Sequence, residues 1–159
     1  MAEVTIYWED FALGQVRELG SLTVSRDEIL TFARQFDPQP FHLDDEAAKA
    51  SVFGGLCASG WHTCALAMRL MVTNFLHQTS SLGSPGLEDV RWHKPVFPGD
   101  TLSLRHTILA TKPMRKRADV GLVQTRWDMF NQHGETVLTM NGWAMFRRRM
   151  PATDAATDA

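Results

Sequence analysis

The sequence predicts an α+β fold in which a long antiparallel sheet wraps around one central helix. Residues 62–77 are apolar on nearly every face at helical spacing, which is typical of a buried helix. Four segments of strand-like composition follow without an intervening helix, at about residues 87–93, 101–111, 119–131 and 136–148. Consecutive strands favour an antiparallel meander, and the simplest way to cover the helix is to curve the sheet around it.

Local signals define the elements before the central helix. Residues 5–20 are expected to form an irregular or short extended lead-in, followed by a strand-like segment at 21–24. Ser25 and Glu28 have the spacing of a capping box, in which each side chain accepts a hydrogen bond from the other residue's backbone amide. This motif predicts a helix start. The helix that follows has one apolar face, formed by Ile29, Phe32, Ala33 and Phe36.

The remaining elements are shorter or more exposed. A second short helix is predicted at residues 44–51, because acidic residues suit the positive end of a helix dipole. Residues 80–86 are rich in Gly, Ser and Pro and predict a turn. Pro98 and Gly99 fit the central positions of a tight turn. The predicted strand at about residues 119–131 alternates between a solvent-exposed face and a buried face. Val123, Thr125, Trp127 and Met129 form the buried face.

Composition restricts the class of protein. A chain of 159 residues fits one domain, which we place at residues 1–150, followed by a small, polar tail at 151–159 that we expect to be disordered. A net charge of -2 gives no electrostatic reason to expect nucleic-acid or membrane binding. No apolar stretch reaches the ~20 residues that span a bilayer. Two cysteines without a secretory leader or CxxC spacing favour a reduced, cytoplasmic protein without a zinc site.

The segment DPQPFH at residues 37–42 is the strongest candidate for chemistry. Asp37 and His42 lie five residues apart, immediately after the first predicted helix, with two prolines between them. Proline restricts both its own backbone and that of the preceding residue, so this loop has few conformations. A stiff loop that carries a carboxylate and an imidazole is suited to acid/base catalysis.

The same segment resembles the D-x-N-P-x-H signature of the MaoC-like, or R-specific enoyl-CoA hydratase, branch of the hot dog fold. Other landmarks occur in the family's order, so that the resemblance covers about residues 10–147. These are Phe11 with Gly14, the capped helix, Ala58-Ser59-Gly60, and KPVFPGDTL at residues 94–102. The resemblance implies a hot dog fold, a homodimer or higher homo-oligomer, and activity on acyl thioesters of coenzyme A with no separate cofactor.

The resemblance also implies roles for individual residues. Asp37 and His42 would hold one water for addition to C3 of a trans-2-enoyl thioester, and their acid and base roles stay open because the pair titrates as a unit. Gly60 precedes the long helix, where free amides favour a carbonyl oxygen that gains negative charge. Gln39 and Ser59 are expected to contribute to substrate binding. Gln39 replaces the usual Asn and Ser59 the usual His, while Phe36 stands where many relatives have Gly.

Basic residues are candidates for contacts with the phosphates of coenzyme A. They are Arg91, Lys94 and the run at residues 112–117 that contains Arg115 and Lys116, with a contact across a subunit boundary as one possibility. A solvated hairpin is the alternative interpretation of that run. His62 is expected to be a core residue, and we assign no chemistry to His93, His106 or His133. No group of residues has metal-ligand spacing, so no metal is predicted.

Three other functions remain open. The first is a dehydratase of a branched or hydroxylated dicarboxylic acyl-CoA, which a wide, polar acyl pocket with an arginine would favour over a narrow apolar tunnel. The second is a hot dog thioesterase, which usually carries a carboxylate on or beside its central helix. Residues 60–77 contain no Asp or Glu, so the sequence disfavours hydrolysis. The third is a non-catalytic module that binds acyl-CoA.

Overall fold

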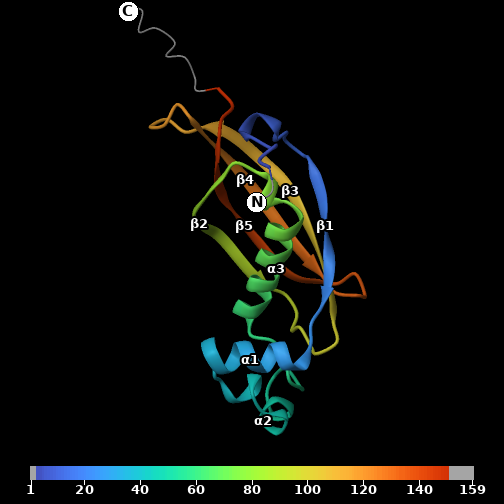
Figure 1. Cartoon of the computed structure of the whole chain (residues 1–159). Helices are drawn as coiled ribbons and strands as arrows, with labels where there is room; N and C mark the ends of the chain where they lie inside the picture. Colours follow the sequence, from blue (N-terminus) through green and yellow to red (C-terminus); the bar gives the residue numbers. More distant parts are fainter. Residues whose placement is uncertain (1–2, 151–159) are drawn as a thin grey trace, which may run out of the picture.

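The computed structural model describes residues 3–150 and shows a curved five-stranded antiparallel sheet with one long helix, α3, along its concave side (Figure 1). The predicted tail at 151–159 lies outside the described residues. The helices are α1 (Arg26–Phe36), α2 (Asp45–Ala50) and α3 (Gly60–Asn74), with 3-10 turns η1 (Trp8–Asp10), η2 (Pro40–His42) and η3 (Leu76–Gln78). The strands are β1 (Val16–Thr23), β2 (Ser81–Trp92), β3 (Thr101–Pro113), β4 (Val120–Phe130) and β5 (Thr136–Arg147).

The predicted start of α1 is confirmed. The Ser25 hydroxyl accepts a hydrogen bond from the Glu28 amide at 3.1 Å, and the Glu28 carboxylate accepts one from the Ser25 amide at 3.0 Å. The helix ends at Phe36. The next residue, Asp37, precedes Pro38, and the proline ring disfavours a helical backbone conformation at Asp37. The Asp37 amide still donates to the Ala33 carbonyl at 3.0 Å, so this residue is fixed at the C-terminal end of α1.

The predicted strand order is wrong in one respect. The sheet has the order β1-β3-β4-β5-β2, so the meander holds for β3, β4 and β5, but β2 pairs with β5 at the far edge. Residues 81–86 are also strand rather than turn, and residues 16–20, expected to be irregular or short extended, belong to the longer strand β1. Register shifts near Gly20, Gly83 and Gly86 explain this difference, because glycine-containing bulges disguise the alternation that reveals a strand.

The alternation predicted for the strand at about residues 119–131 is confirmed in β4, where Val123, Thr125, Trp127 and Met129 are buried. The prediction that α3 is buried all round is wrong for a single chain, because Trp61 is 61% exposed and Met68 is 50% exposed. The buried face of α3 contacts β1 and β3, and its apolar residues on other sides are only partly covered. Within residues 3–150, no helix combines the length and the hydropathy required to cross a bilayer.

A close contact between η1 and β4 stabilises one end of the sheet. The indole of Trp8 lies directly against Gly121, and its Nε1 donates a hydrogen bond to the Leu122 carbonyl at 3.1 Å. A methyl group on residue 121 would overlap the indole ring. The absence of a side chain at this position is therefore a packing requirement.

We expect Gly121→Ala to reduce the free energy of unfolding by about 1–3 kcal/mol, because the added methyl group displaces Trp8 and breaks its hydrogen bond. Denaturant unfolding followed by tryptophan fluorescence measures the change. Gly55→Ala is the matched control, since its methyl group would meet only a Phe97 ring carbon at 3.8 Å. Equal stabilities of the two variants would contradict the packing role of Gly121.

Candidate active site

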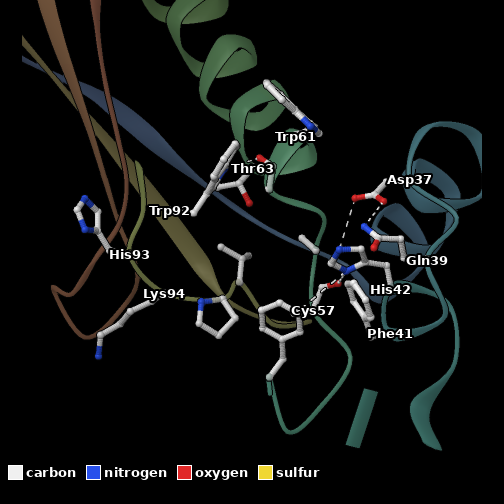
Figure 2. Close-up of a pocket in the computed structure, with 15 residues that line it drawn as sticks. Asp37, Gln39, Phe41, His42, Cys57, Trp61, Thr63, Trp92, His93 and Lys94 are labelled. Atoms are coloured by element: carbon white, nitrogen blue, oxygen red, sulfur yellow. Dashed lines mark hydrogen bonds and ion pairs between the residues drawn. The ribbon is translucent and has the colours of Figure 1, made fainter. Parts of the chain in front are cut away.

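The structure brings the side chains of Asp37 and His42 together at one edge of a cavity (Figure 2). Asp37 closes α1 and His42 closes η2, so the two prolines of the intervening loop set their relative position. Asp37 Oδ2 lies 3.5 Å from His42 Nε2. The side chains are 17% and 6% exposed, respectively, so both are largely shielded from solvent.

A backbone carbonyl fixes the orientation of His42. Its Nδ1 lies 2.8 Å from the carbonyl oxygen of Cys57. A carbonyl oxygen only accepts hydrogen bonds, so Nδ1 carries the hydrogen and donates. In the neutral imidazole, Nε2 therefore presents a lone pair toward Asp37.

Two neutral donors hold the carboxylate of Asp37. The Ser59 hydroxyl donates to Oδ2 at 2.6 Å, and the Gln39 side-chain amide donates to Oδ1 at 2.8 Å. Burial raises the pKa of Asp37, but the hydrogen bonds from Ser59 and Gln39 and the nearby His42 outweigh it, leaving this pKa below its ordinary value. Asp37 is therefore ionised at neutral pH.

When His42 is neutral, this arrangement places two hydrogen-bond acceptors side by side. An ionised carboxylate and an imidazole lone pair cannot bond to each other, but both can accept hydrogens from one water molecule beside them. Such a water would have its own lone pairs free to attack an electrophilic carbon. The geometry is thus suited to adding water to a substrate, or to removing it.

The cavity next to this pair, which we call the first cavity, has a volume of about 420 Å³. It is lined by residues from the loop after α1, from the segment before α3 and the start of α3, and from the end of β2 and the loop after it. They are Asp37, Gln39, Phe41, His42, Phe53, Cys57, Ala58, Gly60, Trp61, Thr63, Trp92, His93, Lys94, Pro95 and Val96. Most are apolar, which is usual for a small-molecule site.

Gly60 lies at the start of α3, where Ser59 is the N-cap and the first amides have no acceptor within the helix. The Trp92 indole covers this residue and donates a hydrogen bond from Nε1 to the Gly60 carbonyl at 2.8 Å. A Cβ on residue 60 would lie 2.7 Å from the indole. Glycine is therefore required for this close approach, and the α3 N-terminus opens onto the first cavity.

The basic residues named from the sequence lie in different places. Lys94 lines the first cavity and pairs with Glu135, whereas Arg91 pairs with Asp89 on β2 and does not line it. Arg115 and Lys116 are in the hairpin between β3 and β4, at the opposite end of the molecule from α1 (Figure 1). Within one chain, these two residues are remote from Asp37.

The two cysteines do not provide a nucleophile. Burial raises the pKa of Cys57 to about 11, so its side chain is a neutral thiol at physiological pH. Burial also raises the pKa of Cys64. Both are free, and within residues 3–150 no three His, Cys, Asp or Glu side chains gather as a metal site would require.

Sequence reasoning missed two parts of this site. The Cys57 carbonyl that orients His42 is a backbone group, and no residue type signals it. Trp92 was included only as part of a strand, although it covers Gly60. A large aromatic residue at the end of a strand is common in any sheet, so its role becomes visible only with the α3 N-terminus in place.

Comparisons with known proteins agree with the fold. Residues 10–127 match the family described as MaoC like domain. A MaoC-like dehydratase from Rhodospirillum rubrum, known from its crystal structure, is 42% identical, with a TM-score of 0.85 over 92% of this chain and all of that chain. Uncharacterized protein YdeM from Bacillus subtilis is 33% identical over 78% of this chain and 86% of its own length.

A third relative carries a named activity. Mesaconyl-CoA hydratase from Cereibacter sphaeroides is 40% identical over 76 residues, which is 48% of this chain but only 22% of that protein. The five-stranded sheet around one helix and the match over most of the chain establish both the fold and the family. The chain has the hot dog fold and belongs to the MaoC-like dehydratase family.

Proposed function

We propose that this protein reversibly hydrates a trans-2-enoyl-CoA to an R-3-hydroxyacyl-CoA, with Asp37 and His42 acting on one water. The observation that supports this most directly is the pair of acceptors, 3.5 Å apart, at the edge of the first cavity. Membership of the MaoC-like family supports hydro-lyase chemistry at this pair.

The proposed reaction needs no cofactor besides the coenzyme A of the substrate. The water oxygen bonds to C3 while the water loses one proton to Asp37 or His42. The electron pair of the C2–C3 double bond moves toward the thioester carbonyl, whose oxygen accepts a hydrogen bond from the Gly60 amide. A proton then reaches C2 from the protonated member of the pair, which completes the addition.

Substrate binding is proposed to use groups on two sides of the pair. Gln39 and Ser59 hold the Asp37 carboxylate toward the reacting carbons. Lys94, with Arg91 nearby on β2, lies where phosphates of coenzyme A could approach. Arg115 and Lys116 would reach the same nucleotide only from a second copy, so their proposed role requires a homodimer or higher homo-oligomer.

A second candidate is dehydration of a branched or hydroxylated dicarboxylic acyl-CoA. The partial match to mesaconyl-CoA hydratase favours it. Against it, no arginine among residues 3–150 lines the first cavity, where a second carboxylate would need a partner. A panel of enoyl-CoA and dicarboxylic enoyl-CoA substrates, followed by loss of the absorbance of the conjugated thioester, separates the two.

Hydrolysis and simple acyl-CoA binding are the two remaining candidate functions. A thioesterase of this fold would need a carboxylate along α3, and residues 60–74 contain none. A binding module would show normal affinity for acyl-CoA without turnover of any substrate in the panel. Release of free coenzyme A, measured with a thiol reagent, would identify hydrolysis.

We expect Asp37→Asn and His42→Ala each to lower kcat for hydration by about 10²–10⁴-fold, the range for loss of a general acid or base. Asp45→Asn is the matched control, because Asp45 is an exposed carboxylate that pairs with Arg26. Full activity in Asp37→Asn or His42→Ala would remove the proposed mechanism. Acyl-CoA affinity near that of the unmodified protein would show that the loss is chemical.

The pH dependence should report the hydrogen bonds to Asp37. This pKa is lowered in the folded protein, so the ionised form and the stability it contributes persist until the pH falls through the lowered value. Ser59→Ala removes one donor and raises the pKa, so the acidic limb of kcat/KM should move to higher pH. Ser25 is the N-cap of α1, as Ser59 is of α3, but it does not contact Asp37. Ser25→Ala should therefore leave the pH of the acidic limb of kcat/KM unchanged.

The role of the Gly60 amide predicts a defect that can be suppressed. Gly60→Ala should lower kcat more than it changes KM, because its methyl group lies 2.7 Å from the Trp92 indole and moves the α3 N-terminus. The double variant Gly60→Ala, Trp92→Phe removes the ring atoms that clash and should recover part of the rate. Equal kcat values for Gly60→Ala and the unmodified protein would exclude this role.

A further inference from the structure

Thr63 lies in the first turn of α3 and lines the first cavity, as does Gly60 three residues earlier. Side chains on a helix point back toward its N-terminus, over the preceding turn. The Thr63 hydroxyl is therefore directed toward the turn that carries the Gly60 amide. Figure 2 shows this side chain at the α3 wall of the cavity, across from Asp37 and His42.

The hydrogen bond that the Thr63 hydroxyl makes within residues 3–150 is long. Its Oγ1 lies 3.4 Å from the Ser59 carbonyl oxygen, whereas O–H···O hydrogen bonds usually measure about 2.5–3.0 Å. The same carbonyl already accepts a shorter bond from the Thr63 amide, at 3.1 Å. By contrast, the hydroxyl of Thr73, near the other end of α3, donates to the Arg69 carbonyl at 2.7 Å. The Thr63 hydroxyl is thus weakly held, and it can rotate toward a better acceptor.

Burial makes this weak bond costly. Thr63 is 3% exposed, and a buried hydroxyl without a good partner destabilises a folded protein. Three other donors that line the first cavity already have acceptors within the chain, each at 2.8 Å. They are Gln39 with the Asp37 carboxylate, His42 with the Cys57 carbonyl, and Trp92 with the Gly60 carbonyl. An acceptor supplied by a bound molecule would complete the bonding of Thr63.

We propose that the Thr63 hydroxyl donates a second hydrogen bond to the thioester carbonyl oxygen of the substrate, beside the bond from the Gly60 amide. This inference rests on the proposed function and adds a catalytic residue to it. A carbonyl oxygen has two lone pairs, so it accepts from two donors. The hydrogen stays on Thr63 throughout, and only its acceptor changes, from the Ser59 carbonyl to the substrate.

The proposed bond contributes most when water adds to C3. At that moment the electron pair of the C2–C3 double bond moves toward the thioester carbonyl, and its oxygen gains negative charge. A hydrogen bond that strengthens as this charge develops lowers the barrier more than it tightens substrate binding. The Thr63 hydroxyl should therefore affect kcat more than KM.

Thr63→Val removes the hydroxyl and keeps the branched shape of the side chain. We expect it to lower kcat for hydration by about 10²-fold with little change in KM, as loss of one donor to an oxyanion does. Thr63→Ser retains the hydroxyl and should keep most of the rate. Thr73→Val is the matched control, because it removes a hydroxyl from the same helix at a residue that does not line the first cavity.

A second measurement does not depend on turnover. Butanoyl-CoA has no C2–C3 double bond, so it binds without being hydrated, and a hydrogen bond to its carbonyl oxygen lowers the C=O stretching frequency. With an isotope label at the thioester carbonyl carbon, infrared difference spectra report this frequency in the bound state. We expect it to be higher in Thr63→Val than in the unmodified protein, Thr63→Ser or Thr73→Val.

The variants also separate the hydroxyl from packing. If Thr63→Val does not fold, Thr63→Ala compared with Thr63→Ser isolates the hydroxyl in the same way, because both lack the methyl group of threonine. Equal losses of kcat in Thr63→Ser and Thr63→Val would show that only the packing of residue 63 matters, and would overturn the inference.

The two measurements distinguish this inference from the proposed function. Hydration with an unchanged kcat in Thr63→Val, or an unchanged carbonyl frequency in that variant, would overturn the role of Thr63 and keep the hydratase. A higher carbonyl frequency in Thr63→Val, in a protein that hydrates no enoyl-CoA, would keep the hydrogen bond and reject hydration. Failure of butanoyl-CoA and of longer saturated acyl-CoA to bind would reject both.

Discussion

The hydrogen bond from His42 Nδ1 to the Cys57 carbonyl is the interaction on which the candidate site depends. It fixes the tautomer of the imidazole and thereby gives Nε2 its lone pair beside Asp37. It also joins η2 to the segment that leads into α3. Ser59 makes a second connection between the same two parts of the chain, since its hydroxyl bonds to Asp37 while it caps α3. The acid/base pair and the α3 N-terminus are thus held as one unit.

The asymmetric placement of α3 explains how a small domain can be both stable and accessible. Its buried face packs against β1 and β3 and contributes to the core. Its other sides border the first cavity and expose apolar residues such as Trp61 and Met68.

Two polar groups that are largely shielded from solvent, Asp37 and His106, lie in contrasting environments. Around Asp37, hydrogen bonds from Ser59 and Gln39 satisfy the carboxylate and keep it charged. At His106, burial and Arg17 keep the imidazole neutral, and its ring nitrogens have no partner within residues 3–150. The first environment favours the ionised form of a side chain, whereas the second favours the neutral form. The same physical terms, desolvation and neighbouring charge, produce both.

The sequence by itself determined the features that depend on neighbouring residues. The capping box of Ser25 and Glu28, the end of α1 before Pro38 and the alternation along β4 all follow from local backbone and side-chain chemistry, and so does the family motif at residues 37–42. Only the tertiary structure decided that β2 lies beside β5, that a backbone carbonyl orients His42, and that His106 is buried. These depend on contacts between distant segments, which local patterns do not encode because a carbonyl or a strand edge can pair with many partners.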